Sequence, residues 1–375
     1  MDQIPLASRA LSLFLELAGI PSPPGEERAV ADRVTAELRS LGLEVEEDDT
    51  AARTGSSIGN LYCRLAPTNG GGTPLFFCAH LDTVPPDGPI TPVIDEGIVR
   101  NASGTILGAV NKAAVVSMVE AIRRVVEERR PHAGVELLFT PKEEVGLVGA
   151  RAFDASRLAA NVGYVYDMAA PIGTVILAAP SARRIDVRFR GKAAHSGMAP
   201  EEGRSAIAAA ARAIADFRLG RIDEETTANV GTIRGGTARN IVPEWCSFGA
   251  EARSLDERKL SDVVEEMLEI STFAASLAEC DVETEVNEDY RAYRFKRDDA
   301  PVQLALAAFE RTGHEVRFDT TGGAADANVL NERGLQCLNL ANGMAEIHTP
   351  DEHIAVDDLD AMVDVTLGII DAALA

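Results

Sequence analysis

Three predominantly apolar runs of strand length, each closed by polar residues, constrain the fold of this chain more than any other feature. They are TPLFFCAHLD (73–82), GVELLFTPKE (134–143) and NVGYVYD (161–167), and a segment with helical spacing (111–128) separates the first two. Strands that are apolar on both faces are typical of a mostly parallel sheet that helices cover on both sides. The first half of the sequence therefore predicts an α/β fold.

The strand pattern changes near residue 180. The segment RIDVRFRG (184–191) alternates, with Ile185, Val187 and Phe189 on one side and charged residues on the other, which is typical of a half-exposed antiparallel strand. From about residue 295 the helix–strand alternation returns. Because 375 residues are too many for one ordinary core, we expect one domain of residues 1–178 and 295–375, interrupted by an α+β insert of residues 179–294.

The composition of the chain limits the cellular compartment and the classes of binding partner that we expect. The formal net charge of −23 repels nucleic acid and anionic lipid, and no apolar run is long enough to span a membrane. The five cysteines are scattered and lack CxxC spacing, as expected for reduced thiols in the cytoplasm. The N-terminal segment MDQIPLASRA carries no signal-peptide pattern.

Histidine and acidic residues collect at the predicted strand ends, where ligands bind in parallel sheets. These residues are His80, Asp82, Glu143, Glu144 and Asp167, and His348 follows a Gly-rich loop. Taken singly, His80 and Asp82 could cap a strand, and the two glutamates could form an acidic first helical turn. Together they predict a metal site of mixed histidine and carboxylate ligands, which suits Zn²⁺, with Co²⁺ or Mn²⁺ also possible.

A set of short motifs extends over nearly the whole chain. They are AHLDTVP, TPKEEVGLVGA, YVYD, GKAAHSGMAPEEGRSAI, GGTARNIVPE, EARS, GGAADANVL and IHTPDEH. In order and spacing this set resembles the dinuclear-zinc peptidases, a family that includes peptidase T, aminoacylases, carboxypeptidases and succinyl-diaminopimelate desuccinylase. The resemblance is strongest to the peptidase T-like branch. It implies a zinc-exopeptidase-like sheet with an inserted lid domain that forms a homodimer, and a small peptide or N-acyl amino acid as substrate.

The resemblance also implies a role for each matching residue. His80 and Asp167 would bind the first metal and Glu144 and His348 the second, while Asp82 would orient His80 and Glu143 would act as general base. In the insert, His195 would stabilise the developing oxyanion in a partner's active site. Asn240 and Arg253 would contact substrate, although Arg253 could equally form an ordinary surface ion pair.

The segment GAVNKAA (108–114) departs from the family pattern. In the family the matching segment resembles Gly-Ala-Asp-Asp-Lys-Ala-Gly, and its first aspartate bridges the two metals; this chain has Val110 there and Asn111 next. Valine has nearly the shape of aspartate but offers no lone pair, and an Asn111 amide oxygen would be a weak ligand. Two protein ligands per metal remain, whereas catalytic zinc normally has three.

Two functions fit this sequence. The first is a metal-dependent aminopeptidase or related amidohydrolase with one or two metals and altered coordination. The second is a catalytically impaired member of the same family that binds a peptide or an amino-acid derivative in its cleft. Fold alone does not separate them.

Overall fold

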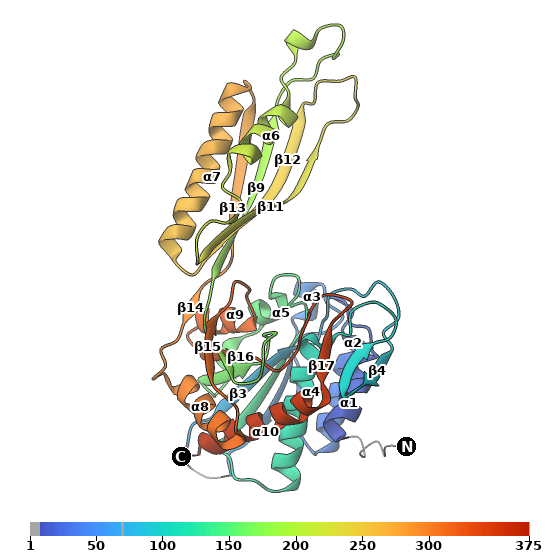
Figure 1. The fold of residues 1–375 in the computed structure, drawn as a ribbon, viewed down its shortest axis with the longest axis vertical. Coiled ribbons are helices and arrows are strands. Elements are labelled where there is room, and N and C mark those ends of the chain that lie inside the picture. The colour runs from blue at the N-terminus through green and yellow to red at the C-terminus, as the bar shows by residue number, and fades with distance from the viewer. Residues whose placement is uncertain (1–7, 69–70, 375) are drawn as a thin grey trace. The chain divides into compact units, whose positions relative to one another are not determined.

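The computed structural model describes residues 8–68 and 71–374 (Figure 1). Residues 1–7, which belong to the segment where we expect no signal peptide, lie outside this description. The chain divides into two compact units: Met1–Leu177 with Arg294–Thr320 and Ala325–Ala375, and Ala178–Tyr293 with Thr321–Ala324. None of the helices in the described part of the chain is both long and apolar enough to cross a lipid bilayer.

The first unit is built on a mixed nine-stranded sheet. Its four central strands are parallel and in the order β6 (Val135–Thr140), β3 (Leu75–His80), β7 (Val162–Val165) and β16 (Gln336–Leu340). One edge carries the antiparallel strands β2 (Leu61–Leu65) and β1 (Val45–Glu47), and the other β8 (Thr174–Ala179), β14 (Tyr293–Arg294) and β15 (Arg317–Thr320). Every side chain of β3 and β6 is buried, as the apolar runs predict, so the parallel arrangement holds at the centre of the sheet.

Helices cover this sheet in two groups (Figure 1). One group is α1 (Arg9–Ala18), α2 (Arg28–Ser40), α4 (Ala109–Glu127), α8 (Ala300–Thr312) and α10 (Val356–Ala372), and the other is α3 (Ala51–Thr54), α5 (Val148–Ala152) and α9 (Asp326–Glu332). The short helix η1 (Ala155–Arg157) precedes β7. A separate three-stranded sheet joins β4 (Pro92–Asp95), β5 (Ile98–Asn101) and β17 (His353–Ala355).

Sequence spacing accounts for how these helices pack. In α2, Val30, Val34 and Leu38 recur every four residues and are buried together on one face, as a helix that borders a core requires. Ser8 caps the N-terminus of helix α1: its hydroxyl accepts a hydrogen bond of 3.1 Å from the Leu11 N–H and so satisfies one free donor of the first turn.

The second unit contains a five-stranded antiparallel sheet. Its order is β10 (Gly220–Arg221), β11 (Thr226–Gly235), β12 (Trp245–Ser254), β9 (Ser181–Arg190) and β13 (Asp281–Tyr290). Helices α6 (Ala206–Asp216) and α7 (Glu257–Leu277) pack on one face, and η2 (Pro200–Glu202) precedes α6.

Strand β9 shows the alternation that the sequence predicts. Ile185, Val187 and Phe189 are buried in the core under α6 and α7, while Asp186 and Arg188 are exposed. The strand lies between β12 and β13, however, and its exposed side chains face away from the helices. The exposed face of β9 and the helix α6 therefore lie on opposite sides of the sheet.

Candidate metal centre

His80 ends the central strand β3 with one ring nitrogen free. Its Nδ1–H donates to the main-chain oxygen of Asp82 at 2.8 Å, and the Asp82 carboxylate lies 3.4 Å from the same nitrogen. The Nε2 atom is buried without a partner and lies 3.9 Å from Oδ2 of Asp167. Because Nδ1 carries the hydrogen, the neutral ring presents a lone pair at Nε2, as a metal-ligating histidine does.

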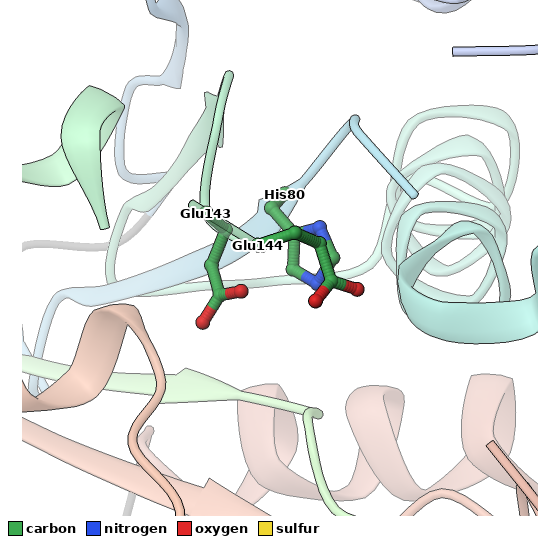
Figure 2. Close-up of side chains that lie close together, drawn as sticks. All are labelled: His80, Glu143 and Glu144. Atoms are coloured by element: carbon green, nitrogen blue, oxygen red, sulfur yellow. The ribbon is translucent and has the colours of Figure 1, made fainter. Parts of the chain in front are cut away.

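Glu143 and Glu144 follow strand β6 in a turn, beside His80. The ligand atoms of the three residues lie within 4.8 Å of one another, and Figure 2 shows the side chains gathered where two strands end. The Asp82 carboxylate accepts the N–H groups of Glu143 at 2.9 Å and Glu144 at 3.1 Å. Since α5 begins only at Val148, the alternative of an acidic first helical turn is excluded.

The electrostatics of this cluster favour a cation. Burial raises the pKa of Glu143 well above its usual range, and the neighbouring carboxylates raise it further. Burial also raises the pKa of Asp167. For His80 burial alone would lower the pKa, but the carboxylates of Asp82, Glu143 and Asp167 raise it well above its ordinary value. Each shift has the direction expected where several buried acids lack a compensating positive charge.

Asp167 and His348 complete the group from other parts of the first unit. Asp167 follows β7, and its main-chain N–H and oxygen pair with the side chain of Asn339 at 3.0 Å each. His348 lies in the loop between β16 and β17, with its Nε2 at 2.9 Å from Oε1 of Glu144. All the residues predicted to bind metal therefore meet at one end of the central strands.

Val110 lies at the start of α4, where its main-chain N–H donates to Glu352 of the loop that carries His348. It is 4% exposed, and neither Val110 nor Asn111 has helical backbone angles, so the regular helix begins at Lys112. Val110 offers no donor atom to a cation. The Asn111 side-chain oxygen is buried without a partner.

The three remaining predicted residues lie in the second unit. Nδ1 of His195 accepts the N–H groups of Gly197 and Met198 at 3.2 Å each, so the hydrogen of the neutral ring is on Nε2. Asn240 is exposed. Arg253 donates to Glu251 at 3.1 Å and to the main-chain oxygen of Gly322 at 3.3 Å, so the ordinary ion pair considered for it is present.

Three buried carboxylates near the centre have no role in the sequence interpretation. Asp326 accepts a hydrogen bond from Thr140, and burial raises its pKa to about 6. Glu27 accepts the N–H of Lys142 at 3.2 Å. Glu352 accepts main-chain N–H groups of the segment before α4. No pattern distinguishes these acids from surface residues, because their partners are distant in sequence; only the small-residue setting of Asp326 in GGAADANVL hints at burial.

A mixed α/β sheet with histidine and carboxylate groups at the ends of its central strands defines a class of metal-dependent hydrolases. The chain belongs to peptidase family M20/M25/M40, whose profile matches residues 76–372. It is a peptidase T-like member of that family and, by class, a metallopeptidase.

Its relatives cover almost the full chain. The structure of aminopeptidase PepT from Bacillus cereus is 40% identical, with a TM-score of 0.90, and covers 98% of this chain and 99% of its own. The structure of a tripeptidase from Staphylococcus aureus is 33% identical, with a TM-score of 0.92, and covers 98% of each chain. The uncharacterized protein YqjE of Bacillus subtilis is 38% identical and covers 97% of this chain and 98% of its own.

Proposed function

We propose that this chain is a slow aminopeptidase-type hydrolase of peptide or amide bonds that holds a single divalent metal tightly. The buried, unpartnered Nε2 of His80, 3.9 Å from Oδ2 of Asp167, carries this proposal. Two donors at that separation can share one ion, because zinc lies about 2 Å from each ligand atom. Together with Glu144, they supply the three protein ligands that a catalytic zinc normally has.

The same residues do not fit two metals. Members of the family are dinuclear metal peptidases, but once His80, Asp167 and Glu144 hold one ion, only His348 remains for a second. Val110 provides no carboxylate to screen two dications about 4 Å apart. We therefore assign one ion per chain, most simply Zn²⁺, with Co²⁺ or Mn²⁺ as substitutes.

Glu143 is the residue proposed to move protons. A metal held by His80, Asp167 and Glu144 would supply a Lewis acid that polarises the scissile carbonyl and acidifies the attacking water. The Glu143 carboxylate would take a proton from that water and give it to the leaving nitrogen. The Asp82 carboxylate supports this role, because it holds the main chain of both glutamates and thereby fixes which one faces the metal and which the water.

The second unit is proposed to act as a lid and the first as the catalytic domain. The tautomer of His195 supports an oxyanion role, since an Nε2–H is the donor that a developing negative charge requires. In this proposal the lid forms a homodimer, so that His195 reaches the active site of the partner, and Asn240 contacts substrate. For Arg253 to bind a substrate carboxylate, it must exchange its contact with Glu251.

Metal analysis of the purified protein, combined with hydrolysis of di- and tripeptides and N-acyl amino acids, tests this function. We expect about one tightly bound metal per chain and slow release of N-terminal residues. The variant His80→Asn should lose both. Light scattering at micromolar concentration tests the dimer, and a monomer would contradict the lid assignment. A cytoplasmic location also stays a prediction.

Val110 favours a second candidate, a binding protein without turnover. In that case the cleft would hold a peptide or an amino-acid derivative, and the carboxylates would recognise its amino group. Peptide binding without hydrolysis, at saturating zinc and unchanged by His80→Asn, would select this candidate.

A further inference from the structure

Glu352 is a buried carboxylate that the proposed chemistry does not use. It lies in the loop that carries His348 and is 2% exposed. Its Oε2 accepts the main-chain N–H groups of Leu107 and Gly108 at 2.8 Å each, and its Oε1 accepts that of Val110 at 3.1 Å. These contacts join segments 242 to 245 residues apart.

The backbone before α4 is shaped to receive this carboxylate. Gly108 has left-handed backbone angles (φ 76°) at the N-cap position of α4, and a Cβ there would lie 3.3 Å from the Thr83 side chain. This turn lets three N–H groups converge on one anion, as in the anion-binding concavities formed by successive amides. The positive end of the helix dipole adds to the attraction. Glu352 is therefore an internal anion that orders this turn.

The other end of Glu352 is anchored as well. Its main-chain N–H donates to the Thr349 oxygen at 3.1 Å, closing a turn that begins one residue after His348. The next residue, His353, begins β17 and pairs with Arg100 on β5. The Glu352 side chain thus connects a sheet-anchored turn beside His348 with the backbone that presents residue 110.

We propose that Glu352 is a positioning residue of the metal centre: it holds the loop of His348, whose Nε2 lies 2.9 Å from the proposed ligand Glu144, in register with residue 110 and thereby sets the metal affinity of the site. The inference rests on the proposed function. All three hydrogen bonds that the Glu352 side chain accepts come from main-chain N–H groups, so they do not depend on the side chain at position 110.

The variant Glu352→Gln tests this role with almost no change of volume. A glutamine side chain has only one amide oxygen, so it would place its NH₂ group against a main-chain N–H donor at the position of the other carboxylate oxygen. Loss of a group that orients metal ligands typically lowers metal affinity about 10- to 100-fold. We expect a loss of that size for Co²⁺, a changed visible spectrum of the bound Co²⁺, and faster hydrogen exchange at the amides of residues 107, 108 and 110.

Glu136→Gln is the matched control. Glu136 is also 2% exposed, and it accepts the main-chain N–H groups of Ala159 at 3.1 Å and Ala160 at 2.8 Å. It lies four residues before the end of β6, about 13 Å along the strand. The Glu136→Gln variant should have a lower melting temperature than the parent, while its Co²⁺ affinity should stay within about twofold of the parent's. Removal of a ligand-orienting group should instead lower the affinity about 10-fold or more.

The outcomes separate this role from the proposed function. A Glu352→Gln protein that keeps the parent's Co²⁺ affinity and spectrum overturns the role alone, as does an equal loss of affinity in Glu136→Gln. A parent that takes up no Co²⁺, with Val110 or with Asp at that position, overturns the proposed function and this role together. If Glu352→Gln does not fold, Glu352→Asp, whose carboxylate is one methylene short, takes its place with the same expectations.

Discussion

The Nε2 atom of His348 lies 2.9 Å from Oε1 of Glu144, although 204 residues separate the two along the chain. The hydrogen bond with Glu144 raises the pKa of His348, against the opposing effect of burial. This hydrogen bond joins the two groups that the family resemblance assigns as ligands of a second metal. Val110 offers no carboxylate that could add to this pair a further ligand for a dication.

Restoring the missing carboxylate should change the metal count. We expect Val110→Asp to raise tightly bound zinc from one to two ions per chain, because a carboxylate of similar volume can bridge the His80–Asp167 and Glu144–His348 pairs. Elemental analysis after dialysis against matched zinc measures this. Val110→Asn, which has the same shape but no charge, should stay near one. Two tight ions in the unmodified chain would show that another group supplies the bridge.

Substitutions of the adjacent residues Glu143 and Glu144 should have different effects. Glu143→Gln should lower kcat by about 10²- to 10⁴-fold, the usual contribution of a general base, while Co²⁺ affinity changes little. Glu144→Gln should instead weaken Co²⁺ binding. Because burial raises the pKa of Glu143, its charged form destabilises the metal-free protein, and Glu143→Gln should melt higher without metal. Equal loss of metal binding in both variants would contradict this division.

Metal should stabilise the folded chain through His80 and Asp167. A metal present at 100 times its dissociation constant adds about 2.7 kcal/mol to the free energy of unfolding, so zinc should raise the melting temperature of the parent by several degrees. His80→Asn and Asp167→Asn should abolish the shift. Differential scanning calorimetry with and without a chelator measures it, and a zinc-induced shift that survives in both variants would place the ion elsewhere.

Lys112 predicts a specific dependence of stability on pH. It is fully buried, its Nζ donates to the Ile20 oxygen at 2.6 Å, and burial lowers its pKa to about 7, although Glu352 opposes this shift. Between pH 7 and about 10.4, the ordinary lysine pKa, the unfolded chain binds a proton that the folded chain does not. The contribution of Lys112 to the free energy of unfolding therefore rises with pH across that window, by up to about 1.4 kcal/mol per pH unit.

The variant Lys112→Met removes this contribution. The difference in melting temperature between parent and variant should shift in favour of the parent as pH increases from 7 to 10, and stay constant below pH 7. A difference that does not change with pH would mean that the folded lysine keeps its ordinary pKa.

The sequence predicts the elements and the neighbourhood of the site for local reasons. Apolar runs without alternation indicate buried parallel strands, and the carboxyl ends of such strands meet at one edge of a sheet. His80, Glu143, Glu144 and Asp167 could therefore be predicted as neighbours from their positions at strand ends. The alternation of apolar and charged residues along β9 likewise predicts a sheet with one buried and one exposed face. Each of these inferences needs only the period of a strand or helix and the place where it stops.

Tertiary structure alone decides which groups act between distant segments. The bonds of Glu352 to the turn before α4, the assignment of Thr321–Ala324 to the second unit, and the interior place of β9 between two partner strands all depend on how loops return the chain. The free Nε2 of His80 depends on a main-chain oxygen two residues away. No periodic pattern encodes such contacts, because a buried carboxylate and a solvated one have the same sequence letter until the surrounding chain removes the water.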